Sequence, residues 1–120
     1  MTSPLQGITV IEVASFIAGP YAGSLLADLG ADVIKVEAPE GGDPFRGWDT
    51  GTESASFWAY NRGKRSITLN LREPAAIDVL HRLVRSADVL LETCGRARWI
   101  AWASGTPTSA RSTRGWSMHL

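Results

Sequence analysis

The sequence predicts an α/β fold, Rossmann-like, built on a mainly parallel sheet. Two observations predict it, and the chain length limits it to one domain. Short β-branched apolar runs alternate along the chain with amphipathic helical patterns. The first strand–helix–strand unit covers residues 8–37, the usual length of a right-handed parallel crossover. The chain has 120 residues, which is enough for one ordinary domain and too few for two.

The first half of the chain supplies the first crossover. Residues 8–13, ITVIEV, are β-branched and apolar and predict a buried strand. Pro20 suits the first turn of a helix over residues 21–29, because its missing N–H costs nothing there. Gly30 ends this helix, and residues 31–37 form a second strand.

The second half repeats the alternation after a loop. Residues 38–56 contain two prolines and four glycines and predict irregular structure. The next run, 56–63, has room for one or two helical turns. A third strand follows over 66–71, then a helix from Pro74 to about Ala87 with apolar residues on one face. Residues 88–92 complete the pattern as a fourth strand.

Composition excludes several classes of protein. Apolar residues make up 44% and charged residues 20%, which is typical of a soluble globular chain. No apolar run is long enough to span a bilayer, and the N-terminus lacks the basic start of a secretory signal. The single cysteine, Cys94, fits a reducing compartment, so we expect a cytoplasmic protein. Twelve Lys and Arg balance twelve Asp and Glu, which argues against nucleic-acid and membrane partners.

The balanced charge hides a boundary at Glu92. Residues 1–92 carry eight basic and twelve acidic residues, for a net charge of −4. Residues 93–120 carry four arginines and no acid, for a net charge of +4, together with three of the five tryptophans. They show no sustained helical or strand period. Such a change in composition usually marks the edge of a domain, so we expect an irregular tail after Glu92.

Two segments have both a functional and a structural interpretation. The turn from Ala18 to Gly23, followed by Glu37, resembles a dinucleotide site in which Glu37 holds a ribose. However, the turn lacks the G-x-G-x-x-G pattern, and Pro20 removes a donor to a pyrophosphate, which favours an ordinary tight turn. The basic run 61–66 indicates either phosphate recognition or a solvated loop.

The remaining polar signals favour structural roles. Glu40 to Asp43 is typical of a turn rather than a cation site, and no cluster of metal ligands accompanies it. His81 is interpreted as a surface histidine. Cys94 has no nearby histidine to activate it as a nucleophile. We therefore predict no metal cofactor and no catalytic residue from these groups. The arginines and tryptophans of the tail also allow a non-catalytic interaction segment.

Six stretches carry a family resemblance. They are PLxGIxVIE at 4–12, AGP at 18–20, LxDLGADVIKVE at 26–37, GDPxR at 42–46, GKRSIxLNL at 63–71 and ADVLLE at 87–92. Together they resemble the N-terminal part of the family III CoA-transferases. That family includes formyl-CoA and carnitine CoA-transferases and the α-methylacyl-CoA racemases. The resemblance covers residues 4–92 nearly continuously.

The resemblance implies an activity on acyl-CoA. In the transferases of this family an aspartate attacks the thioester and carries the acyl group as a mixed anhydride. CoA thiolate then attacks again, and a carboxylic acid acceptor completes the exchange. That aspartate lies beyond this chain, so we expect no catalytic residue here and no activity of the chain alone. The full-length family forms an interlocked homodimer. The racemase branch and a Rossmann-type nucleotide-binding module stay open as alternatives.

The resemblance also implies residues that contact coenzyme A. Family members bind CoA with the turn that matches Ile17 and Ala18. They also use the strand end that matches Leu69, Asn70, Leu71 and Arg72. Arg72 supplies a cation where the family often has Lys or Arg. A further arginine that family members place after the second strand is replaced here by Ala38.

The tail departs from the family, and a shifted reading frame accounts for the departure. The family continues after LLE with a segment like NxRPGxxxRLGLGY, whereas this chain has Thr93-Cys94-Gly95-Arg96. If residues 93–120 are back-translated and each codon is read from its third base, the shifted frame can encode VRPGALDRLGLGYADLRALNPRLVYAS. Trp and Met each have a single codon, so four residues of this shifted sequence are fixed, provided that Ser117 uses a TCN codon. We therefore expect 1–92 to be the CoA-binding segment and 93–120 to be a frameshifted, poorly ordered tail. A divergent tail is the alternative.

Overall fold

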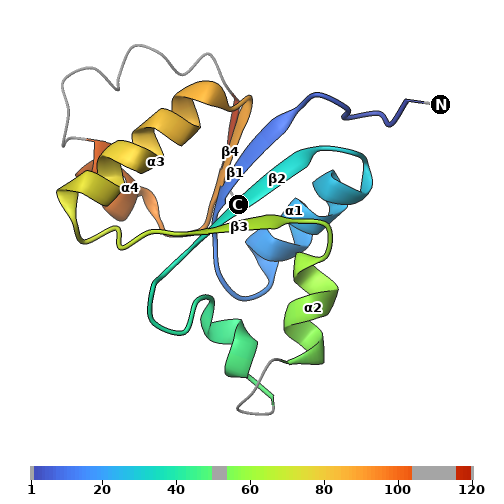
Figure 1. Ribbon diagram of the computed structural model, residues 1–120, viewed down its shortest axis with the longest axis horizontal. Coiled ribbons are helices and arrows are strands. Elements are labelled where there is room, and N and C mark those ends of the chain that lie inside the picture. Colours follow the sequence, from blue (N-terminus) through green and yellow to red (C-terminus); the bar gives the residue numbers. More distant parts are fainter. Residues whose placement is uncertain (1, 50–53, 104–115, 120) are drawn as a thin grey trace.

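The computed structural model describes residues 2–49, 54–103 and 116–119. In these residues, five parallel strands form one sheet in the order β3-β2-β1-β4-β5 (Figure 1). The chain therefore starts at the centre of the sheet, builds outward on one side through β2 and β3, and returns to the other side for β4. This order is that of a Rossmann-like α/β fold and confirms the predicted fold class.

Strands and helices alternate along the chain. In order, the elements are β1 (Thr9–Val13), α1 (Ala18–Asp28), β2 (Asp32–Glu37), the short 3-10 helix η1 (Pro44–Gly47), α2 (Ala55–Asn61), β3 (Arg65–Thr68), α3 (Pro74–Ser86), β4 (Val89–Glu92), α4 (Arg96–Ala103) and β5 (Trp116–His119). The four strands and the two long helices predicted from the sequence are confirmed. Their boundaries differ by a few residues.

Helix α1 begins at Ala18 rather than at the predicted residue 21. Pro20 still lies in the first turn, where no intrahelical hydrogen bond needs its nitrogen.

The loop prediction for residues 38–56 misses the short 3-10 helix η1. The side chain of Asp43 accepts a hydrogen bond from the Phe45 N–H, and Pro44 occupies the first helical position. A cap and a proline thus start a short helix inside a glycine-rich segment.

Strand β3 ends earlier than predicted, at Thr68 instead of residue 71. The Leu69 N–H still donates to the Glu37 carbonyl (2.9 Å), but the Glu73 N–H then donates to the Asn70 carbonyl (2.9 Å). The chain therefore turns at Asn70 and enters α3.

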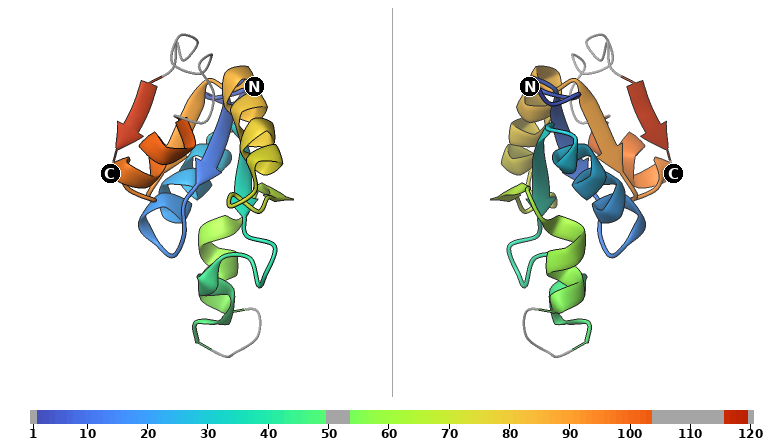
Figure 2. Two further views of the ribbon diagram at one scale, coloured as in Figure 1. Left: turned by 90° about the vertical axis from the view of Figure 1, so that its left-hand side faces the viewer. Right: turned by 90° about the vertical axis from the view of Figure 1, so that its right-hand side faces the viewer.

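Helices cover both faces of the sheet (Figure 2). On one face Val10, Val33 and Leu91 are buried against α1, with Leu26 packed beside them. On the other face Ile11, Val13 and Val36 are buried against Leu80 of α3. The central strand β1 therefore contributes to both apolar clusters, as expected for a strand buried on both sides.

The segment after Glu92 contains regular structure, which the sequence did not predict. Helix α4 packs by Trp99 and Trp102 on the α3 face of the sheet, and β5 pairs with β4 in parallel. The expected irregular tail is therefore wrong for 96–103 and 116–119. Residues 104–115 lie outside the described part of the chain, so the expected poor order there stays a prediction.

Candidate functional site

The carboxyl edge of the sheet gathers the residues predicted to bind coenzyme A. The chain leaves β1 through the turn 14–17 and leaves β3 through the segment 69–72. Because all the strands are parallel, both segments lie at the same edge, where open α/β sheets bind their ligands. Strand β2 lies between β1 and β3, so the ends of these two strands are about 10 Å apart across two strand spacings.

The turn after β1 presents Ile17 and Ala18 to solvent. Phe16 adopts a left-handed backbone conformation with φ +66°, and Ile17 is 51% exposed. Ala18, which is also exposed, is the first residue of α1. A Cβ on Gly19 would lie 2.3 Å from the Ala14 Cβ, so the glycine allows the helix to start directly against the end of β1. Both predicted contact residues are therefore accessible at this edge.

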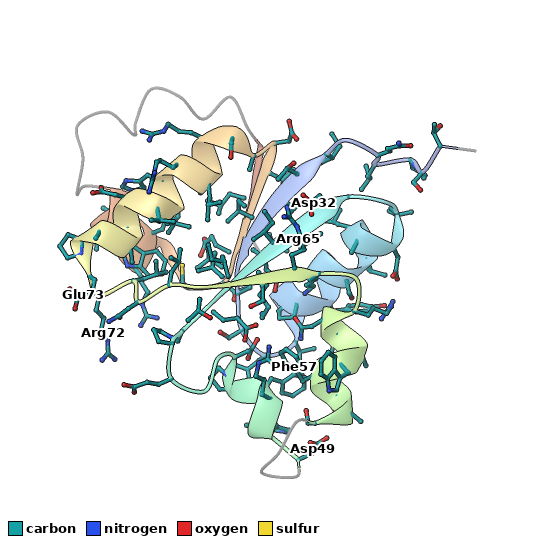
Figure 3. The ribbon with its side chains drawn as sticks, viewed as in Figure 1. Asp32, Asp49, Phe57, Arg65, Arg72 and Glu73 are labelled. Carbon is teal, nitrogen blue, oxygen red and sulfur yellow. The ribbon has the colours of Figure 1, made fainter. Side chains whose placement is uncertain are left out.

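The segment after β3 divides between core and surface. The side chains of Leu69 and Leu71 pack against the buried cluster around Ile11, so these two side chains contribute to the core. Asn70 is exposed, and its Oδ1 accepts from the Arg72 N–H (3.3 Å). Figure 3 shows Arg72 and Glu73 where this segment enters α3, with the Arg72 side chain extending away from the ribbon.

Four charged side chains lie buried behind this edge and are called here the ion cluster: Glu12, Lys35, Asp43 and Lys64. The Lys35 Nζ lies 2.9 Å from Glu12 Oε1 and 2.8 Å from Asp43 Oδ2, and the Lys64 Nζ lies 2.7 Å from Glu12 Oε2. No side chain of the four is more than 2% exposed. Burial lowers the pKa of Lys64, an effect that the Glu12 carboxylate partly opposes. Two cations and two carboxylates thus neutralise one another.

Glu37, at the end of β2, is fully occupied by donors. Its Oε1 accepts from Arg46 Nη2 (2.9 Å) and from the Ser66 hydroxyl (2.8 Å). Its Oε2 accepts from Arg46 Nε (2.9 Å) and from the Asp43 N–H (2.9 Å). Burial would raise the pKa of Glu37, but Arg46, the Asp43 N–H and Ser66 outweigh it and lower the pKa to about 2. A carboxylate that is ionised at neutral pH and already accepts four hydrogen bonds is unsuited to holding a ribose, which argues against the dinucleotide alternative.

The basic run 61–66 is used within the chain. Lys64 also donates to the Pro20 carbonyl (2.8 Å) and to Asn61 Oδ1 (3.0 Å), so it is neither solvated nor open to a phosphate. Arg62 pairs with Asp28 and Arg65 pairs with Asp32 at the surface. Neither the phosphate-recognition interpretation nor the solvated-loop interpretation of this segment therefore predicts the buried position of Lys64. In contrast, Arg72 forms no ion pair with the described residues, which leaves its guanidinium open to an anionic ligand.

Three further expectations can be compared with the structure. Asp43 is a buried ion partner rather than only a turn residue. His81 is buried, not at the surface, and its Nε2 lies 3.1 Å from the Trp102 carbonyl of α4. Burial and the Glu92 carboxylate raise the pKa of the Cys94 thiol to about 12, so the thiol stays protonated. The only sign in the sequence that Asp43 and Lys64 are buried ion partners is their charge beside glycine-rich turns, and that pattern is also typical of surface loops.

No group of three or more His, Cys, Asp or Glu side chains is placed to hold a metal ion in ranges 2–49, 54–103 and 116–119. Within the same ranges, no helix has the length and apolar character that crossing a membrane requires.

The sheet order, the helix start beside β1 and the exposed segments at the carboxyl edge define a Rossmann-type α/β unit. Comparison with known proteins identifies its family. The model of CoA-transferase family III matches residues 5–110, and the chain belongs to this family. The match extends past Glu92, farther than the resemblance seen in the sequence.

Individual relatives agree with this assignment. The chain is 52% identical to succinate–glutarate CoA-transferase of Agrobacterium fabrum over 102 residues, 78% of this chain and 26% of the relative. It is 40% identical to human succinyl-CoA:glutarate CoA-transferase over 74% of this chain and 21% of the relative. A CAIB/BAIF family protein from Brucella suis has a similar structure, with 42% identity, a TM-score of 0.77, and coverage of 86% of this chain and 29% of that one. The chain thus spans about a quarter of the length of these curated relatives.

Proposed function

We propose that this chain is the CoA-binding segment of an acyl-CoA transferase that moves CoA between carboxylic acids. The observation that carries the proposal is the shared carboxyl edge. There the family's two CoA-contacting segments, Ile17–Ala18 and Leu69–Arg72, are both accessible. The saturated Glu37 disfavours the nucleotide-binding alternative at the same edge.

Each segment has a distinct role in the proposal. The backbone of Ile17 and Ala18 contacts CoA at the first turn of α1, where unpaired N–H groups favour an acceptor. The backbone of Leu69 to Leu71 lines the opposite side, because the leucine side chains are occupied in the core. Arg72 pairs with a CoA phosphate, since its guanidinium has no ion-pair partner among the described residues and guanidinium groups bind phosphate well.

Relatives suggest the acids involved. The two curated relatives described above are named for succinate or succinyl-CoA and for glutarate. We therefore propose short dicarboxylic acids as acyl group and acceptor, and the transferase rather than the racemase branch. The reaction would use an aspartate that takes the acyl group from the thioester as CoA thiolate leaves. We propose that this aspartate lies in the part of the relatives that the chain does not cover, so the chain alone would be inactive. The complete enzyme would be a cytoplasmic homodimer without a metal.

The binding proposal is tested by calorimetric titration of the 120-residue chain with CoA and with NAD. We expect CoA to bind and NAD not to bind. Replacing Arg72 by Ala removes a charge-assisted contact and should weaken CoA binding by roughly five- to thirtyfold. The matched control is Arg82→Ala, an exposed arginine farther along α3, which should leave the affinity unchanged. Tighter binding of NAD, or equal losses for both arginines, would overturn the proposal.

We further propose that residues 93–120 are read in a shifted frame after a one-base deletion at the codon following Glu92. The composition supports this, because residues 93–120 as they stand carry four arginines and no acidic residue, whereas residues 1–92 carry twelve acidic residues. Sequencing the gene past codon 92 tests the idea. Family sequence in the shifted frame is the expected result, and its absence would leave a divergent tail.

A further inference from the structure

The backbone at Phe16 requires an explanation. Among the described residues, Phe16 is the only one other than glycine with a positive φ, at +66°. The left-handed region is unfavourable for residues with a Cβ, and more so for a bulky one. Such a conformation persists only where surrounding contacts hold it. It lies directly before Ile17 and Ala18, so whatever holds Phe16 also determines how these two residues are presented.

Asp43 supplies the contact at the Phe16 amide. Its Oδ1 accepts from the Phe16 N–H (3.2 Å) and from the Phe45 N–H (2.9 Å). The carboxylate side chain is only 1% exposed. Its Oδ2 is fixed by the Lys35 ammonium at 2.8 Å, so the carboxylate cannot rotate away without breaking a buried ion pair.

The same ion cluster holds the turn at neighbouring points. The Lys35 Nζ donates to the Ala14 carbonyl (2.8 Å), two residues before Phe16. The Lys64 Nζ donates to the Pro20 carbonyl (2.8 Å), in the first turn of α1. The cluster therefore contacts the backbone before, at and after the turn, from three segments that are distant in sequence.

The Phe16 side chain completes the arrangement. Its ring lies 5.7 Å from the Trp48 ring and 6.2 Å from the Phe45 ring, between centroids. Trp48 and Phe45 follow Asp43 closely in η1 and at its end. One segment, 43–48, thus holds both the amide and the ring of Phe16.

We propose that Asp43 is a positioning residue, whose buried carboxylate fixes the left-handed turn at Phe16 and so presents Ile17 and Ala18 to coenzyme A. This inference rests on the proposed function for its ligand. It concerns a residue that does not itself reach the surface.

A double-mutant cycle separates this role from a merely structural one. Glycine adopts a positive φ freely, so Phe16→Gly removes the need for the Asp43 contact. In the chain with Phe16, Asp43→Ala should weaken CoA binding about tenfold, as expected for a lost charge-assisted hydrogen bond. In the Phe16→Gly chain, the same change should weaken it less than about threefold. Equal losses in the two chains would overturn the proposal, because a purely structural Asp43 would not interact with the backbone preference of residue 16.

A second measurement keeps the test independent of CoA. Hydrogen exchange of the Phe16 amide should be slow in the original chain and at least about tenfold faster in Asp43→Ala, if the carboxylate holds that N–H. If Asp43→Ala does not fold, exchange in the original chain still decides: a Phe16 amide that exchanges as fast as an unprotected one contradicts the proposal. If the original chain binds no CoA while the Phe16 amide is protected, the proposed function fails and the positioning contact stands.

Discussion

Lys64 and Arg65 are adjacent in sequence and carry the same charge, yet the structure uses them in opposite ways. The Lys64 side chain is 2% exposed and pairs with Glu12, which is fully buried. The Arg65 side chain is 65% exposed and pairs with Asp32 at the surface. Both residues are labelled in Figure 3. The first belongs to the ion cluster behind the carboxyl edge, and the second lies on an edge strand of the sheet.

The difference shows that burial, rather than pairing, determines how much a charge matters. A surface pair is screened by water and salt, so each partner is well solvated without the other. A buried pair has no such alternative, and removing one partner leaves the other uncompensated. The ion cluster should therefore be intolerant of change, whereas the pairs along β3 and α1 should be replaceable.

The largest effect is expected for Glu12→Gln. Glu12 is the carboxylate that contacts both Lys35 and Lys64, so the change leaves a buried excess of positive charge. The free energy of unfolding should fall by about 3–5 kcal/mol, a large part of the stability of an ordinary domain. Urea denaturation followed by circular dichroism measures it. Asp28→Asn, which breaks only a surface pair, is the control. Similar losses for the two variants would contradict the comparison.

A smaller loss is expected when the packing around the ion cluster is changed without changing charge. A Cβ on Gly23 would lie 2.0 Å from Glu12 Oε2 and 3.1 Å from Lys64 Nζ, so Gly23→Ala forces the cluster apart. Overpacking of this kind should cost about 1–3 kcal/mol of unfolding free energy. Gly47→Ala is the matched control, since its Cβ would meet nothing within 4 Å. A Gly23→Ala chain as stable as the Gly47→Ala chain would mean that α1 moves away from the cluster easily.

The contribution of a buried charge can also be measured through the pH dependence of stability, and Glu37 is suited to this. Its folded pKa of about 2 lies below its ordinary value of 4.5, so it stabilises the fold above pH 4.5 and loses this contribution as the pH falls toward 2. Replacing Arg46 by Met removes the bidentate partner. The variant should lose about 1–2 kcal/mol at pH 7 and show a shallower decline in stability between pH 4.5 and 2. Unfolding across this pH range measures it, and an unchanged pH profile would contradict the role of Arg46.

The arrangement of strands was predictable because it follows from local patterns. The β-branched run at 8–13 and the apolar face from Ile77 to Val84 predict a strand and a helix from their own residues. Parallel order then follows from their alternation, and it brings Ile17 and Arg72 to one edge. The boundaries were less predictable, because the end of β3 depends on the turn at Asn70 that leads into α3.

The ion cluster was not predictable for a physical reason. Its members come from β1, β2, the loop before η1 and the loop before β3, and nothing in their spacing indicates that they meet. Asp43 follows two glycines, which is equally typical of a solvated turn. His81 illustrates the same limit, since it is buried by contact with α4, in the segment where the sequence shows no sustained period.

The smallest effect is expected for Arg65→Ala. The change removes the surface pair with Asp32 but leaves both sites in water, so the melting temperature should stay within about 1 °C of the original chain. Differential scanning calorimetry at low and at high salt measures it, and salt should reduce even this difference. The neighbouring change Lys64→Ala, measured in the same way, should lower the melting temperature strongly, because it leaves a buried carboxylate oxygen of Glu12 without its cation. Equal shifts in melting temperature for Arg65→Ala and Lys64→Ala would show that these charges stabilise the fold through pairing alone. Burial would then not explain how much each charge contributes.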